Sequence, residues 1–274
     1  MKRYFSEEKL NRVARDFDFL IARVNKSYGE LDFRLRDGYF NVYYQGNSLA
    51  YVRVAKEDYI IRIHKKFLEN EVYSQDPRFV GRYISRGENV EYRLTPDELK
   101  PFFQQKYLKK IQSNIKRVLS SEEITFEHIL ITDNLDRPDL ILIDRQVTET
   151  ELKGKRIDLL ALRQLRGINY QFVVIEVKLG KNPELRSAVL DQISGYIKHI
   201  ESHFEDWKQS YQLTYVQLRK LGLLMHMEFE EVVIQRGVKG LIAVGGYSGI
   251  ATKYIKELSV YLGDIEIRQF ANRF

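Results

Sequence analysis

The chain of 274 residues contains no cysteine. This absence excludes disulfide bonds, zinc sites built from thiolates and catalytic cysteines. Long apolar runs are also missing, since none approaches the ~18 residues that a membrane-spanning helix needs. The first residues, MKRYFSEEKLNR, lack the apolar segment of a secretory signal peptide. We therefore expect a cytoplasmic protein without a membrane partner.

The composition that remains is mixed and moderately basic. Hydrophobic residues make up 44% of the chain and charged residues 30%, as in ordinary globular proteins. The formal net charge of +6 favours an anionic partner such as nucleic acid. Basic residues gather in residues 106–117, KYLKKIQSNIKR, whose apolar positions recur at helical spacing. Lys109, Lys110 and Lys116 would form its outer face, which is either a solvated surface or one that contacts phosphates.

The pattern of the first hundred residues predicts a small α+β module. Residues 6–27 have the apolar spacing of a helix. Residues 31–67 alternate, are rich in tyrosine and contain turn sequences, which predicts three or four antiparallel strands. We place the boundary of this module near residue 100, so that residues 101–274 form a second domain.

The second domain has the pattern of an α/β fold. Strands are expected at residues 140–144, 156–162, 172–179, 239–245 and 264–270, and helices at 106–119, 184–204, 211–236 and 250–262. Strands that alternate in this way with long helices predict a central mixed sheet flanked by helices.

Two charges interrupt the apolar strand FVVIEVKL, residues 172–179. Glu176 and Lys178 are two residues apart, so their side chains point to the same face of the strand. Burying them there is costly unless they pair or act on something. Asp158, in RIDLL on a neighbouring strand, could bring a second carboxylate beside Glu176. Two adjacent carboxylates repel unless a hard cation such as Mg²⁺ lies between them.

This arrangement would suit metal-assisted attack on a phosphate. Lys178 would lie beside the cation, where it could orient or deprotonate the attacking water and offset phosphate charge. Gln192 and Tyr196, four residues apart in QISGY, would share one helix face and offer donors to a phosphate or base. The alternative is a solvated Glu–Lys pair on an edge strand, against which the apolar flanks of the two charges argue.

The segments RIDLL, VVIEVKLG and AVLDQISGYI together resemble the PD-(D/E)XK nuclease superfamily, and the Gln-x-x-x-Tyr spacing resembles its RecB-type branch. The resemblance covers roughly residues 105–274 and implies a restriction-endonuclease-like fold. It implies that Asp158, Glu176 and the main-chain carbonyl of Val177 hold Mg²⁺ or Mn²⁺. It also implies that Lys178 acts on the water and that Gln192 and Tyr196 face nucleic acid.

The chain departs from this family pattern at two places. Such nucleases often carry a glutamate on the first core helix, and residues 106–119, taken as that helix, contain none. The substitutes are Glu122, Glu123, Glu127 and Glu151. The proline of the family name is replaced by Ile157, and the literal Pro-Asp at Pro138-Asp139 is too far along the chain from Glu176 for adjacent hairpin strands.

The expected function is that of a metal-dependent nuclease that hydrolyses phosphodiester bonds in DNA, with RNA as the alternative substrate. A homodimer would suit cutting of both strands of a duplex. Two other functions remain open: a nuclease-fold protein that binds nucleic acid without cutting it, and an interaction scaffold. His199 and His203 share a helix face, but without an evident third ligand the sequence favours surface histidines over a zinc site.

Overall fold

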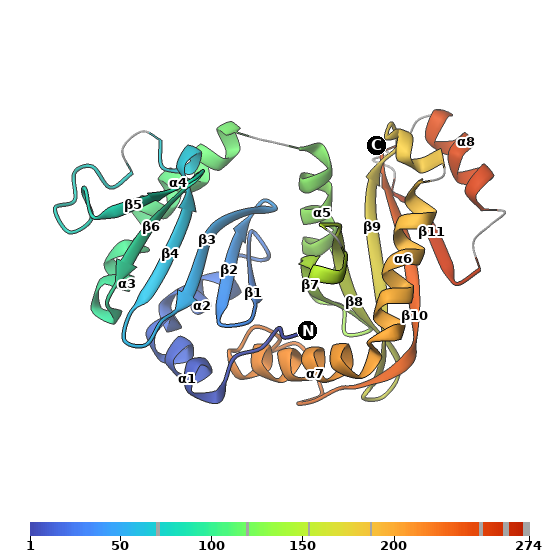
Figure 1. Ribbon diagram of the computed structural model, residues 1–274, viewed down its shortest axis with the longest axis horizontal. Coiled ribbons are helices and arrows are strands. Elements are labelled where there is room, and N and C mark those ends of the chain that lie inside the picture. The colour runs from blue at the N-terminus through green and yellow to red at the C-terminus, as the bar shows by residue number, and fades with distance from the viewer. Residues whose placement is uncertain are drawn as a thin grey trace. The chain divides into compact units, whose positions relative to one another are not determined.

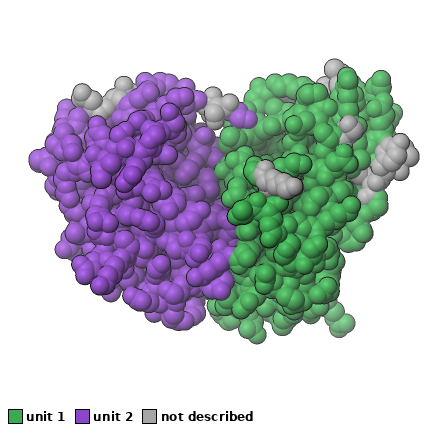
Figure 2. Space-filling view, viewed as in Figure 1, with its two compact units in different colours: residues 1, 122–216, 226–274 green, residues 2–121, 217–225 purple. Residues whose placement is uncertain are grey.

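The computed structural model describes residues 1–69, 72–118, 121–152, 154–186, 188–246, 249–259 and 263–270. The chain divides into two compact units, which Figure 2 colours separately. Unit 2 holds residues 2–121 and 217–225, and unit 1 holds residue 1, residues 122–216 and residues 226–274. Within the described ranges, no helix is long and apolar enough to cross a membrane. The chain contains both helices and strands, with the strands in two separate sheets, and is therefore a mixed α/β protein.

Unit 2 contains a six-stranded antiparallel sheet in the order β1-β2-β3-β4-β6-β5. Its strands are β1 (Leu31–Leu35), β2 (Tyr39–Tyr44), β3 (Asn47–Val54), β4 (Tyr59–His64), β5 (Tyr83–Arg86) and β6 (Asn89–Leu94). The turn between β2 and β3 is made by Gln45 and Gly46, both with positive φ (46° and 79°). Two positive φ values in succession give the hairpin turn whose twist matches antiparallel strands. The antiparallel strands expected from residues 31–67 are therefore confirmed.

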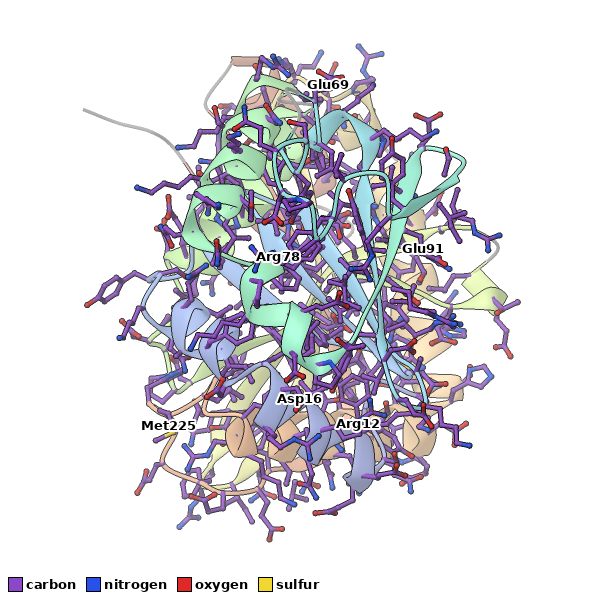
Figure 3. All side chains as sticks on the ribbon, turned by 90° about the vertical axis from the view of Figure 1, so that its left-hand side faces the viewer. Arg12, Asp16, Glu69, Arg78, Glu91 and Met225 are labelled. Carbon is purple, nitrogen blue, oxygen red and sulfur yellow. The ribbon has the colours of Figure 1, made fainter. Side chains whose placement is uncertain are left out.

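The N-terminal helix is broken rather than continuous. The structure has α1 (Glu7–Asp16) and α2 (Asp18–Asn25) where a single helix was expected over residues 6–27. Phe17 lies between them, fully buried, with its ring edge-on to Phe40 and Tyr59 at 5.0 Å from each ring centroid. Just before the break, the carboxylate of Asp16 accepts a hydrogen bond of 2.6 Å from the Tyr59 hydroxyl. Figure 3 labels Asp16 in unit 2.

The basic helix belongs to unit 2 and not to the second domain in which we placed it. Unit 2 also contains α3 (Pro96–Phe102) and this helix, α4 (Gln105–Val118), so the boundary lies after residue 121 instead of near residue 100. The physical reason is that the side-chain amide of Asn114, in α4, is buried and hydrogen-bonded within unit 2. Asn114 donates from Nδ2 to the backbone carbonyls of Phe67 (2.9 Å) and Glu69 (2.6 Å), which ties α4 to the chain that follows β4.

Unit 1 is built on a mixed five-stranded sheet in the order β11-β10-β9-β8-β7. Its strands are β7 (Leu140–Thr148), β8 (Arg156–Arg166), β9 (Asn169–Leu179), β10 (Val233–Gly245) and β11 (Ile265–Phe270). β7, β8 and β9 are antiparallel, whereas β9, β10 and β11 are parallel. All five strands expected from the sequence are present, although most begin earlier or end later than expected.

The helices of unit 1 cover both faces of this sheet (Figure 1). They are α5 (Glu122–Thr132), α6 (Ala188–Ser202), α8 (Gly249–Leu258) and α7 (Phe204–Lys220), whose residues from Gln217 onward belong to unit 2. The helix expected over residues 184–204 begins as a 3-10 turn, Pro183–Arg186, before α6 starts. The end of the helix expected over 250–262 lies outside the described residues.

The helix expected over residues 211–236 is confirmed for residues 211–220 and wrong beyond them. α7 ends at Lys220, and Gly222 follows with a φ of +74°. The amide of Gly222 donates to the carbonyl of Arg219, and the amide of Leu223 donates to that of Leu218, which is the glycine-based helix ending known as the Schellman motif. The chain then joins the sheet, because Val233 already pairs with Asn169 of β9.

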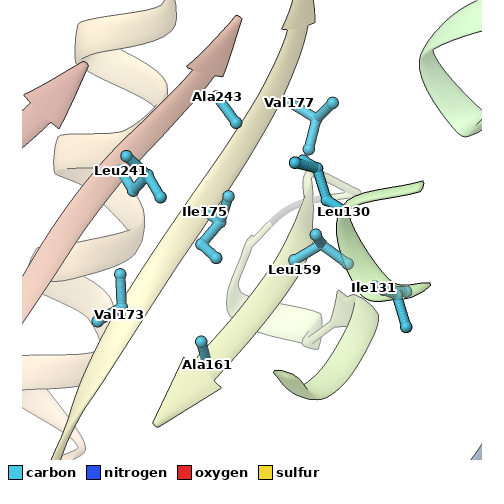
Figure 4. Packing of buried hydrophobic residues seen from close by; sticks show 9 residues of the cluster. All are labelled: Leu130, Ile131, Leu159, Ala161, Val173, Ile175, Val177, Leu241 and Ala243. Atoms are coloured by element: carbon cyan, nitrogen blue, oxygen red, sulfur yellow. The ribbon is translucent and has the colours of Figure 1, made fainter. Parts of the chain in front are cut away.

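Alternation along β9 separates its two faces. Val173, Ile175 and Val177 point to the face where Leu130 and Ile131 of α5 complete a buried apolar cluster (Figure 4). The residues between them point to the opposite face, which α6 covers. β9 is therefore buried on both faces, and Glu176 and Lys178 lie on the α6 face.

Gly245, at the end of β10, allows α5 to approach the sheet. A Cβ atom there would lie 2.6 Å from Cδ1 of Phe126, closer than side-chain carbons pack. Gly195 offers a contrast, because it lies in α6 and a Cβ atom there would meet nothing within 4 Å.

We predict opposite effects for alanine at these two glycines. Gly245→Ala should lower the free energy of unfolding by about 1–3 kcal/mol, because it overpacks the contact with Phe126. Gly195→Ala should raise it by roughly 0.5–1 kcal/mol, because alanine favours a helix interior more than glycine. Urea denaturation of both variants would test this, and a stable Gly245→Ala protein would contradict the close packing of α5.

Candidate active site

The candidate site forms where β8 separates from β9. The two strands pair up to Leu159 opposite Ile175, after which β8 continues back to Arg156 paired with β7 alone. β9 runs on to Leu179, so its edge on this side is free of strand partners beyond Ile175 in the described residues. Side chains bind this edge in place of a strand.

Two carboxylates occupy the free edge of β9. Asp158 accepts a hydrogen bond of 2.9 Å from the amide of Val177. Glu123 of α5 accepts one of 3.2 Å from the amide of Leu179, two residues further along. The amide and carbonyl of one strand residue point to the same side. The carbonyl of Val177 therefore also faces this edge, between the two acids.

Glu176 and Lys178 meet side chains of α6 and of the turn before it. Glu176 accepts a hydrogen bond of 2.7 Å on Oε1 from the Gln192 amide. The same oxygen lies 2.9 Å from Nζ of Lys178. Nζ also lies 2.8 Å from the carboxylate of Glu184, in the 3-10 turn Pro183–Arg186. Lys178 is thus held between two acids.

Gln192 and Tyr196 form hydrogen bonds within unit 1. The Gln192 amide lies 3.0 Å from the Tyr196 hydroxyl, and that hydroxyl donates to the carbonyl of Arg156 at 2.9 Å. Tyr196 is only 1% exposed. These groups therefore position Glu176 and fasten α6 to the start of β8, two residues from Asp158.

Burial of like charges perturbs the acids of the site. Burial, followed by the neighbouring charge of Asp158, raises the pKa of Glu176 to about 8, although Lys178 opposes the shift. The pKa of Asp158 is also raised by burial, against the effect of its hydrogen bond from Val177. Burial would lower the pKa of Lys178, but the adjacent Glu176 and Glu184 raise it overall, so this amine stays protonated at neutral pH.

The arrangement fits a hard divalent cation. Oε2 of Glu176 is buried and has no hydrogen-bond partner. Asp158, Glu176 and the Val177 carbonyl supply oxygen atoms only, the ligands that Mg²⁺ and Mn²⁺ prefer. A cation beside two buried carboxylates would also offset the repulsion that raises their pKa values. The residues present therefore match the proposed ligand set.

Glu123 is the one of the four substitute glutamates that lies at this edge of β9. We took residues 106–119 as the first core helix, whereas α5 is the helix that packs on β9. Glu123 is fixed there by Leu179 and by Asn182, whose amide donates to it at 2.7 Å. The signal was present as the acid-rich start of α5, directly before the apolar residues that enter the core.

Other residues singled out from the sequence lie elsewhere. Lys109, Lys110 and Lys116 are exposed on α4, which belongs to unit 2. Asp139 pairs with Arg137, and its carbonyl accepts from the amide of Gln164, near the end of β8 opposite to Asp158. The literal Pro-Asp is thus outside the site.

The raised pKa of Glu176 predicts a pH-dependent stability. Its carboxyl binds a proton more tightly in the folded chain than in the unfolded chain, where the pKa is 4.5. This contribution to stability is complete below pH 4.5 and is lost as the pH rises through about 8. Wild type should therefore lose stability relative to Glu176→Gln over this range, by on the order of a few kcal/mol.

Denaturant unfolding of both proteins in EDTA, at several pH values, would measure this difference. A difference that does not change with pH, or that favours wild type as the pH rises, would contradict a buried carboxyl with a raised pKa at position 176.

No protein-family model, no curated protein and no solved structure matches the chain. The resemblance to the PD-(D/E)XK nuclease superfamily therefore rests only on the segments RIDLL, VVIEVKLG and AVLDQISGYI.

Proposed function

We propose that unit 1 is a restriction-endonuclease-like domain that hydrolyses phosphodiester bonds of DNA with Mg²⁺ or Mn²⁺. The observation that carries this proposal is the grouping of Asp158, Glu176 and Lys178 where β8 leaves β9, with an unpartnered buried oxygen on Glu176. A purely structural ion pair would need one acid for one base. Here Asp158 adds a further carboxylate, and the pKa of Glu176 is raised despite its contact with Lys178.

Each residue has a distinct role in this proposal. Asp158, Glu176 and the Val177 carbonyl would hold the cation. When bound, the cation would polarise the phosphate and lower the pKa of an attacking water. Lys178 stays protonated, so it acts as a donor that orients the water and offsets the charge that develops on the phosphate, rather than as a general base. To contact the water and the phosphate, Lys178 would have to give up its contact with Glu184.

The positioning residues hold these groups in place. Gln192 fixes the carboxylate of Glu176 through its amide, and Tyr196 holds α6 against the Arg156 carbonyl. Glu123 lies on the same free edge as Asp158 and is close enough to raise the pKa of Asp158. It would add negative charge beside the cation and strengthen its binding.

We predict metal-dependent cutting that two conservative changes abolish. Asp158→Asn keeps an acceptor for the Val177 amide but loses the charge, and Lys178→Met keeps the length of the stem but loses the ammonium. Each should lower the rate of cleavage of linear or plasmid DNA at least ~100-fold. EDTA should stop cleavage, and Lys198→Met, an exposed change on α6, should leave the rate unchanged.

The outcomes of this assay separate the three functions considered. Cutting in Lys178→Met at the wild-type rate would contradict the proposal. No cutting by wild type, with salt-sensitive DNA binding intact, would instead assign the domain to binding without cleavage. Absence of both would leave Glu176 and Lys178 as a structural pair in an interaction scaffold.

A second prediction concerns Glu123. Glu123→Gln should raise the Mg²⁺ concentration needed for half-maximal cleavage several-fold, and excess Mg²⁺ should restore most of the rate, because the variant loses charge but keeps an acceptor for Leu179. Glu122→Gln is the matched control, since Glu122 is exposed and pairs with Lys181. Equal Mg²⁺ dependence of the two variants would show that Glu123 does not contribute to binding of the cation.

A further inference from the structure

The face of α6 that supports the candidate site continues toward the end of the helix. Tyr196 is followed on this face by His199, and His203 comes directly after the last residue of α6, seven residues beyond Tyr196. They meet Glu151, which lies in the 3-10 turn Thr150–Leu152 between β7 and β8. The Glu151 carboxylate lies 3.1 Å from Nε2 of His203 and 3.7 Å from Nδ1 of His199.

These three groups have the spacing of a metal site. One ligand atom from each of Glu151, His199 and His203 lies within 4.8 Å of the other two. Ligands at ~2.0–2.2 Å from a tetrahedral zinc are about 3.3–3.6 Å from one another. Small rotations of side chains that are not fully buried would bring the three atoms to this separation.

A further contact sets the orientation of one imidazole. Nδ1 of His203 lies 3.0 Å from the backbone carbonyl of His199. A carbonyl only accepts hydrogen bonds, so Nδ1 donates to it, and Nε2 is the ring nitrogen that faces Glu151 and would bind a cation. Metal-binding histidines are commonly fixed in this way by a backbone carbonyl on the second ring nitrogen.

We propose that Glu151, His199 and His203 bind a borderline transition-metal cation of the Zn²⁺ class, with water as the fourth ligand. Two imidazole nitrogens and one carboxylate suit Zn²⁺ and Co²⁺, whereas Mg²⁺ prefers oxygen alone. The sequence favoured surface histidines only because no third ligand was evident, and the turn between β7 and β8 supplies it. This inference does not depend on nuclease activity.

The site would connect two elements that also form the candidate active site. Glu151 belongs to the turn that leads into β8, which carries Asp158. His199 belongs to α6, which carries Gln192, and His203 directly follows that helix. The hydrogen bond from Tyr196 to Arg156 already joins the same two elements. A bound cation would add a second link, so we expect it to raise the thermal midpoint of unfolding by mass action.

Competition with a chromophoric zinc chelator tests the proposal on the tag-free full chain. Wild type should bind one equivalent of Zn²⁺ that excess Mg²⁺ does not displace. His203→Asn and Glu151→Gln, both at partly exposed side chains, should each weaken binding at least tenfold and remove the thermal shift. Co²⁺ should give the intense visible absorption of a tetrahedral site in wild type and lose it in both variants.

Two control variants locate the ion. His64→Asn, at a histidine of unit 2, should bind Zn²⁺ as wild type does. Glu176→Gln should also bind one equivalent of Zn²⁺, because the acids beside β9 form a different site. Circular dichroism would establish that each variant is folded. No binding by wild type, unchanged binding in His203→Asn, or loss of binding in Glu176→Gln would each overturn the proposal.

Discussion

The separation of β8 from β9 after Leu159 is the constraint on which the candidate site depends. It leaves the backbone of Val177 and Leu179 without a neighbouring strand on one side, and such groups are costly to leave unpaired in a protein interior. Asp158 and Glu123 supply acceptors for the two amides. The need to satisfy the backbone thus brings carboxylates to the end of β9, where electrostatics alone would keep them apart.

Helices that pack on the two faces of β9 hold the residues of the site in place. On one face, the apolar cluster with Leu130 fixes α5, and the missing side chain of Gly245 lets Phe126 approach the sheet. On the other face, α6 places Gln192 against Glu176. The acids are therefore held from both sides of the sheet by helices that pack tightly.

Local pattern was enough to predict the strands and the central pair of acids. FVVIEVKL is apolar and β-branched, and the side-chain alternation of a strand puts Glu176 and Lys178 on one face whatever the tertiary context. Asp158 followed from the expectation that its strand neighbours β9. Gln192 and Tyr196 followed from helical spacing, although spacing alone did not show that their polar groups point inward.

The remaining features depended on contacts between distant segments. The basic helix has a clear amphipathic pattern, but the pattern does not say which sheet it packs on, and the bonds of Asn114 decide that. Because this helix was misplaced, the sequence did not distinguish Glu123 from the other three substitute glutamates. Gly222 was a local signal for the end of α7 that the apolar spacing of residues 211–236 outweighed. Glu151 meets the two histidines only through the fold of the turn between β7 and β8.

Anomalous diffraction from a crystal grown with Mn²⁺ tests the central claim most directly. The structure predicts a peak in contact with the carboxylates of Asp158 and Glu176 and the carbonyl of Val177, at the ~2.1–2.2 Å expected for oxygen ligands. It also predicts that the peak is absent from Asp158→Asn crystals. A wild-type crystal with no peak there, and with Glu176 still paired to Lys178, would show that the buried acids do not form a metal site.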